Sequence, residues 1–140
     1  MTTLKMDVPA LNRFFAKEFP QADQSFVIEE VTPEKTVVRL RVTEAHLRPG
    51  GTVSGPAMFL LADVGIYVAV LARIGPVALA VTTNANMDFM RKPVAGADLL
   101  AEVRMLKVGR SLAVGDVLIY SEGKPEPVAR ASMTYAIPPV

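Results

Sequence analysis

The sequence predicts an α+β fold in which an antiparallel β-sheet wraps around one long central helix. Residues 56–72 are apolar throughout except for Asp63, and a helix that is apolar on all sides belongs in a core. Residues 77–136 contain several strand-like segments separated by short turns, which is typical of an antiparallel sheet with one covered face. The apolar helix is the only element long enough to cover that face.

Composition narrows the class of protein. The 140 residues are 51% hydrophobic and 6% aromatic, so we expect a single domain, residues 1–140, with an aliphatic core. A formal net charge of +1 argues against a nucleic-acid binder that relies on bulk electrostatics. The chain has no cysteine and one histidine, so neither a disulfide framework nor a zinc site is expected.

The location expected from the sequence is cytoplasmic, because the N-terminus lacks the apolar stretch of a signal peptide. The apolar segment 57–72 has 16 residues with Asp63 near its middle, short of the roughly 20 apolar residues that a membrane span needs. We therefore expect no membrane association. The excess of apolar residues is better explained by burial against other copies of the chain.

Short elements are expected before the central helix. Residues 9–19 space their apolar side chains as an amphipathic helix does, and Asp7 suits the N-cap position. Residues 25–31 and 35–42 alternate apolar and polar side chains on either side of a turn, which predicts a β-hairpin.

Four strands are expected after the central helix, which should end at Gly75. In the first of them strict alternation places Thr82 on the polar face with the other even-numbered residues, opposite an apolar face. A two-residue turn, 109–110, is expected between two later strands. The four strands are residues 77–89, 97–108, 111–120 and 128–136.

A glycine- and proline-rich loop, residues 46–55, leads into the central helix. Ser54 or Gly55 should cap this helix, and Pro56 suits its first turn. Free N–H groups and a partial positive charge at a helix N-terminus stabilise a developing oxyanion, and glycine permits close approach to the backbone. The alternative is that Gly55 and Pro56 only mark the start of the helix.

Asp63 is the second candidate for chemistry. A carboxylate inside an apolar helix must be paired, neutralised or in use, so it is either catalytic or held by structural hydrogen bonds. Eight residues separate it from Gly55, which is about 12 Å along a helix axis. If both residues serve one reaction, they must come from two chains of a two-fold dimer.

The order of these elements and the motif HLRPGGTVSGP at residues 46–56 resemble the hotdog-fold acyl-CoA thioesterases of the phenylacetate-pathway type. That family has His-x-Asn-x-x-Gly-x-x-His-Gly-Gly, then six residues, then an acidic residue. Gly51, Gly55 and Asp63 match the pattern here. The sequence departs from it at three positions, which hold Arg48, Ser54 and Pro56.

The resemblance implies a hydrolase that cleaves acyl-CoA and works as a homodimer or homotetramer, with CoA as part of the substrate and no separate cofactor. Asp63 would be the general base or nucleophile and the Gly55 amide the oxyanion donor, with Ser54 and Arg48 completing the catalytic set. The residues expected to bind substrate are His46, Pro56, Phe59, Tyr67, Thr82 and Thr83, and for the CoA phosphates Arg91, Lys92 and Arg110.

Several of these residues could instead have ordinary structural roles. Arg48 would pair with Asp63 of the other chain, bind a carboxylate on the acyl group, or lie in solvent. Ser54 would donate a hydrogen bond or cap the helix. The rest of this group would then consist of packing residues (Phe59 and Tyr67), plain strand residues (Thr82 and Thr83) and a structural loop residue (His46).

Two other functions fit the same fold. A hotdog protein that binds a thioester without hydrolysing it is favoured by the replacements at positions 48 and 54 and opposed by Asp63. A hydratase or dehydratase would pair a histidine with an acid, and the single histidine, His46, lies in the loop. A purely structural interaction protein is disfavoured, because a buried aspartate has no evident structural purpose there.

Overall fold

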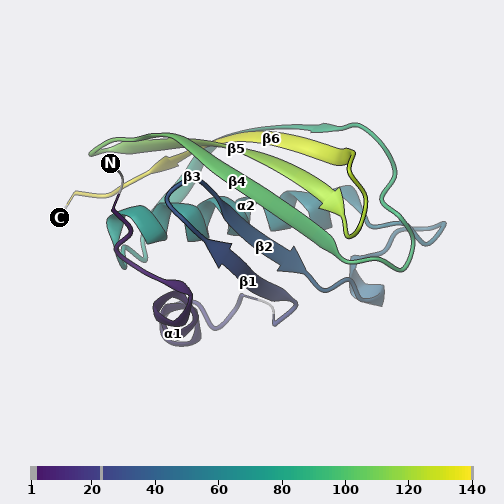
Figure 1. Cartoon of the computed structure of the whole chain (residues 1–140), viewed down its shortest axis with the longest axis horizontal. Coiled ribbons are helices and arrows are strands. Elements are labelled where there is room, and N and C mark those ends of the chain that lie inside the picture. Colours follow the sequence, from purple (N-terminus) through teal and green to yellow (C-terminus); the bar gives the residue numbers. More distant parts are fainter. Residues whose placement is uncertain (1–2, 23, 140) are drawn as a thin grey trace.

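The computed structural model describes residues 3–22 and 24–139. One six-stranded antiparallel sheet, in the order β1-β2-β4-β5-β6-β3, curves around the long helix α2 (Figure 1). This is the expected α+β hotdog architecture. The elements are α1 Val8–Glu18, β1 Phe26–Val31, β2 Thr36–Leu40, the 3-10 turn η1 Glu44–His46, α2 Gly55–Ile74, β3 Val81–Phe89, β4 Leu99–Val108, β5 Leu112–Ser121 and β6 Pro127–Ala136.

Helix α2 forms the centre of the core. Leu61, Ile66 and Leu71 are fully enclosed by the sheet and α1. The helix is long and apolar enough by composition to cross a membrane, yet 72% of its most apolar window is buried within this fold, as expected for a core helix. The serine cap is confirmed, since Ser54 Oγ accepts the Ala57 N–H at 3.2 Å.

Two glycines let α2 lie close to the sheet. A Cβ added at Gly65 would meet Val103 Cγ2 at 3.0 Å, and one at Gly115 would meet Ile66 Cδ1 at 2.8 Å. Both distances are shorter than ordinary packing contacts, so larger residues would push the helix and strands apart.

Helix α1 lies beside β1 and against α2 (Figure 1). The predicted N-cap is confirmed, since Asp7 Oδ1 accepts the Ala10 N–H at 3.0 Å. The buried face carries Leu11 and Phe14. Phe15 and Phe19 form an aromatic cluster with Tyr67 of α2, so the helix is anchored over the middle of α2.

Strand β3 differs from its prediction in length and in phase. It begins at Val81, because residues 77–80 form a turn closed by the Ala80 N–H and the Val77 carbonyl. Thr82 pairs with Tyr135, whereas Asn84 pairs with Thr134, so Thr83 is an extra residue in a β-bulge. A bulge reverses the alternation, and the expected placement of Thr82 on the outer face is therefore wrong.

The other strands follow the predictions closely. The hairpin of β1 and β2 is confirmed, and β4, β5 and β6 form in the expected order. The connection between β4 and β5 has three residues, 109–111, rather than two, because β5 begins only at Leu112, whose carbonyl accepts the Gly109 N–H.

Arg39 on β2 ties three parts of the sheet together. Its guanidinium contacts Asp98 at 2.9 Å, Glu122 at 2.7 Å and Glu29 at 3.1 Å. Desolvation raises the pKa of Asp98, but the hydrogen bond from the Val42 N–H and the Arg39 charge lower it more, so that this pKa falls below its ordinary value of 3.8. The group thus stabilises the fold above pH 4.

We expect Arg39→Gln to lower the free energy of unfolding at pH 7 by about 1–2 kcal/mol. A carboxyl whose pKa is depressed by folding contributes stability that is lost as pH falls. The wild-type urea midpoint should therefore drop between pH 5 and pH 3, and the drop should be smaller in the variant. The exposed pair of Arg130 and Asp88 supplies the control, because Arg130→Gln should change neither quantity appreciably. Equal acid sensitivity of wild type and Arg39→Gln would contradict this account.

Candidate active site

The carboxylate of Asp63 is held by two hydroxyl groups. Thr82 Oγ1 on β3 donates to Asp63 Oδ1 at 2.5 Å, and the Tyr135 hydroxyl on β6 donates to the same oxygen at 2.7 Å. Asp63 Oδ2 accepts no hydrogen bond from the described residues, and no buried side-chain polar atom among them lacks a partner. Oδ2 is therefore accessible, and one oxygen of the carboxylate is fixed while the other is open.

Tyr135 is a site residue that the sequence analysis did not identify. Its side chain is buried, and its ring stacks on Tyr67 with centroids 6.0 Å apart. Burial first, and the charge of Asp63 second, raise the pKa of Tyr135 far above its usual 10, so the hydroxyl remains a donor. The inward-facing series in residues 129–135 ends at Tyr135, and a hydroxyl on that face was the available signal.

Asp63 opens into a cavity of about 310 Å³ between α2, the end of α1 and the start of β3, here called the Asp63 cavity. Most of its wall is apolar, so a thioester carbonyl placed beside Oδ2 would be partly screened from water. The other lining residues are Glu18, Phe19, Leu60, Val64, Tyr67, Ala78, Ala80, Val81, Thr82 and Tyr135.

A second cavity of about 550 Å³ lies over the N-terminus of α2, here called the Gly55 cavity. Arg48, Arg91 and Lys92 line it together with Gly55 and the ring of Phe89. The Gly55 N–H has no acceptor among the described residues. A free amide, a helix N-terminus and three cationic side chains suit an anionic ligand.

The loop before α2 is shaped by His46. This side chain is buried, and its Nδ1 accepts the Thr43 N–H at 2.9 Å. Its carbonyl accepts the Ser54 N–H at 2.8 Å. Gly50 and Gly51 adopt positive φ angles of 99° and 82°, which suits glycine. His46 lines neither of the two cavities, so the structure favours a structural role in the loop over contact with substrate.

The remaining expected residues fall in different places. Thr83 is exposed, and its hydroxyl lies 3.4 Å from the Thr134 carbonyl rather than near Asp63. Tyr67 lines the Asp63 cavity and donates to the Ala78 carbonyl at 2.9 Å, whereas Phe59 is 41% exposed and does not line it. Pro56 is exposed in the first turn of α2.

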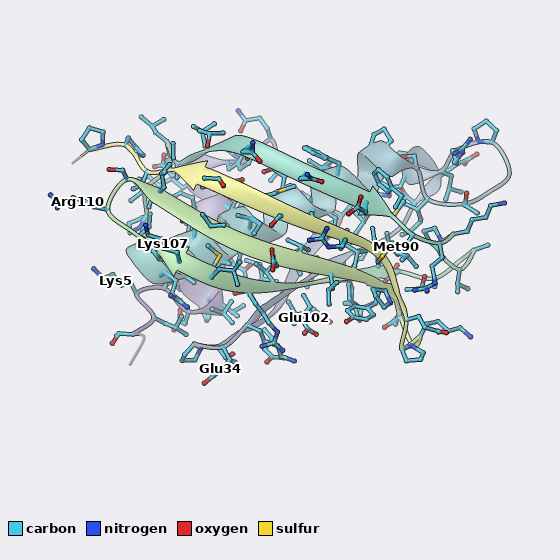
Figure 2. All side chains as sticks on the ribbon, turned by 90° about the horizontal axis from the view of Figure 1, so that it is seen from above. Lys5, Glu34, Met90, Glu102, Lys107 and Arg110 are labelled. Carbon is cyan, nitrogen blue, oxygen red and sulfur yellow. The ribbon has the colours of Figure 1, made fainter. Side chains whose placement is uncertain are left out.

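The basic residues do not form one cluster within a chain. Arg91 and Lys92 follow β3 and line the Gly55 cavity. Figure 2 shows Arg110, beside Lys107, at one end of the sheet and Met90 at the other. Arg110 is therefore remote from Arg91 and Lys92 in the same chain.

The two cavities have no lining residue in common. One holds the open carboxylate of Asp63, and the other holds the free amide of Gly55, about 12 Å away along α2. Each chain thus contains two half-sites with complementary chemistry.

We expect Tyr135→Phe to lower the free energy of unfolding at pH 7 by about 1–3 kcal/mol, because Asp63 loses a buried donor. A tyrosine whose pKa folding raises contributes stability that is lost as pH rises above 10. The fall of the urea midpoint between pH 9 and pH 11, at fixed protein concentration, should therefore be smaller in Tyr135→Phe than in wild type. Thr82→Val is the matched control, since it removes the other donor and should keep the wild-type alkaline fall. The same alkaline fall in all three proteins would contradict the assignment.

Comparisons with known proteins agree with this geometry. The chain is 30% identical over 113 residues to "Putative esterase PA0474" of Pseudomonas aeruginosa, covering 81% of this chain and 83% of that protein. A "putative thioesterase" from Silicibacter sp. TM1040 is 55% identical, with a TM-score of 0.92 over 99% of this chain and 96% of that one.

Two further solved structures are more distant. A mutant of phenylacetic acid degradation protein PaaI from Thermus thermophilus is 29% identical, with a TM-score of 0.69 over 80% of this chain and 92% of that one. The protein smu.793 from Streptococcus mutans UA159, bound to acetyl CoA, shares the fold at 23% identity, with a TM-score of 0.71 over 82% and 90% of the two chains. Residues 50–128, which contain both Gly55 and Asp63, match the family described as the thioesterase superfamily. The chain belongs to the thioesterase superfamily.

Proposed function

We propose that this protein hydrolyses acyl-CoA thioesters at a site shared by two chains. Membership of the thioesterase superfamily supports thioester hydrolysis in general. The observation that carries the specific proposal is the carboxylate of Asp63, with Oδ1 fixed by Thr82 and Tyr135 and Oδ2 open to an apolar cavity. A fixed, accessible carboxylate is what a general base or nucleophile requires.

Strand β3 supports the two-chain arrangement. It is an edge of the sheet, and Val81 and Phe89 near its two ends are 57% and 54% exposed. A long exposed edge invites pairing with another strand. Val81 lines the Asp63 cavity, and Phe89 lines the Gly55 cavity. Antiparallel pairing of two β3 edges about a two-fold axis would bring each Asp63 cavity towards the partner's Gly55 cavity.

In the proposed reaction the thioester carbonyl oxygen accepts a hydrogen bond from the partner's Gly55 N–H. Asp63 Oδ2 takes a proton from a water molecule, whose oxygen attacks the carbonyl carbon. The C–S bond then breaks, and the CoA sulfur receives the proton from Asp63. Direct attack by Oδ2, followed by hydrolysis of the resulting anhydride, gives the same products. Ser54 acts through its cap, which positions the amide at the start of α2.

Coenzyme A suits the charges around the Gly55 cavity. Arg91 and Lys92 line its mouth with Arg48 and would meet phosphates. In the proposed dimer, opposite ends of two chains lie together, so Arg110 of the partner subunit would approach the same end. Acetyl CoA bound to the structurally similar smu.793 protein supports a CoA thioester as ligand.

Thioester binding without hydrolysis is the second candidate. It is favoured by Arg48 and Ser54, which stand where the resembling thioesterases have asparagine and histidine. In that case Asp63 would hold the ligand but transfer no proton.

Asp63→Asn should reduce kcat for thiol release from acyl-CoA by a factor of about 10² to 10⁴, because the amide cannot accept the proton of water. The measurement is free thiol appearing from short-chain, medium-chain and aryl acyl-CoAs, with Asp63→Ala beside it. Sedimentation should show an unchanged oligomer. Wild-type protein that binds acyl-CoA but releases no thiol would establish binding without hydrolysis, and full activity in Asp63→Ala would remove Asp63 from the mechanism.

Gly55→Pro tests whether the site is shared. Proline lacks an N–H, fits the first position of a helix, and follows Ser54 with ψ at 154°, which the residue before proline favours. Loss of one oxyanion donor should cost about 10² to 10³ in kcat, whereas Gly55→Ala keeps the amide and should stay active.

Co-expression of Gly55→Pro with Asp63→Asn should restore roughly a quarter of wild-type activity, because half of randomly paired dimers contain one intact composite site. Mixing the two purified dimers without exchange of chains should restore nothing. No recovery in verified heterodimers would place both groups in one chain and contradict the shared site.

A further inference from the structure

A third cavity lies beneath helix α1. It has a volume of about 360 Å³ and separates α1 from β1, β2 and α2, and it is here called the α1 pocket. Its apolar wall includes Phe15, Ala16, Phe26, Ile28, Val38 and Val68. An apolar space of this size is larger than close packing ordinarily leaves between elements, so an apolar occupant would gain free energy on entering it.

The α1 pocket adjoins the Asp63 cavity. Phe19 and Val64 line both spaces. Phe19 is the C-cap residue of α1 and is only half-buried; its ring stacks on Phe15 at 6.0 Å and meets the edge of Tyr67 at 5.9 Å. A side chain at the end of a helix thus stands between the two cavities, and side chains turn far more readily than backbone.

The charges along this path select the occupant. None of the described residues that line the α1 pocket carries a charge. Glu18 lines the Asp63 cavity near Phe19, and its carboxylate would repel an acyl group that ends in a carboxylate. The path therefore suits a neutral, apolar chain and disfavours a dicarboxylic one.

We propose that the α1 pocket is the distal acyl subsite, so that the preferred substrates are thioesters of neutral medium- to long-chain acids. The inference rests on the proposed function, because it takes the thioester carbonyl to lie at Asp63. The carbonyl end of the acyl group occupies the Asp63 cavity, and the tail passes Phe19 into the α1 pocket.

The test is the dependence of kcat/KM on chain length across straight-chain acyl-CoAs, in wild type and in Ala16→Phe. Ala16 is exposed on α1 and lines only the α1 pocket of these cavities, so a larger side chain there should fill the pocket without disturbing the core. In wild type, kcat/KM should rise about fourfold per methylene while the tail is being buried. Ala16→Phe should leave butyryl-CoA within about twofold and lower dodecanoyl-CoA at least about tenfold.

Lys17→Phe is the matched control, since the neighbouring residue adds the same side chain to α1 but lines neither cavity. It should reproduce the wild-type profile. A rise with chain length that Ala16→Phe leaves intact would overturn the subsite, and so would a flat profile in wild type.

Binding separates failure of this inference from failure of the proposed function. With the Asp63→Asn variant, isothermal titration calorimetry should show dodecanoyl-CoA binding at least about tenfold more tightly than butyryl-CoA. Adding Ala16→Phe should abolish that difference. Both results would support the subsite even if wild type releases no thiol, whereas equal affinities for the two thioesters would overturn it whatever the turnover.

Discussion

The carboxylate of Asp63 is the group around which the rest of the fold must be arranged. It lies on a helix whose other residues are apolar, where an unpartnered charge is costly. The structure meets this demand with two neutral hydroxyls, from Thr82 and Tyr135, rather than with a cation. Hydrogen bonds to Oδ1 orient the carboxylate and leave Oδ2 as an acceptor. An arginine placed there instead would hold both oxygens and leave less basicity for chemistry.

The β-bulge at Thr83 connects this carboxylate with the helix N-terminus. One extra residue turns Thr82 inward to Asp63, and it also sets the following pairs so that Phe89 opposes Ala129, which is buried. Phe89 thereby reaches Gly55, where its ring would lie 3.4 Å from an added Cβ. A strand of regular alternation would aim only one of these two side chains inward. The bulge therefore serves both half-sites at once.

The sequence analysis predicted what depends on local pattern. The central helix, its serine cap and the isolated Asp63 follow from composition and spacing, and the structure bears out the elements that they predicted. The bulge leaves no trace in the alternation of residues 77–89, because Thr83 itself resembles its apolar neighbours in β-propensity. The role of Tyr135 depends on a pairing with Thr82 across more than fifty residues, and no local pattern records such a contact. For the same reason, periodicity could not reveal that Arg110 lies far from Arg91.

The separation of opposite charges within one chain has a consequence for assembly. Arg48, Arg91 and Lys92 surround Gly55, whereas Asp63 is satisfied by neutral donors in another cavity. Because Asp63 needs no cation, the three basic side chains need not neutralise it and are left for an anionic ligand. Pairing of two β3 edges would bring the cationic end of one chain to the carboxylate of the other without burying a salt bridge, whose desolvation is costly. A CoA thioester has its phosphates at one end and its neutral acyl group at the other, and it would span such a junction with each part facing the chemistry that suits it.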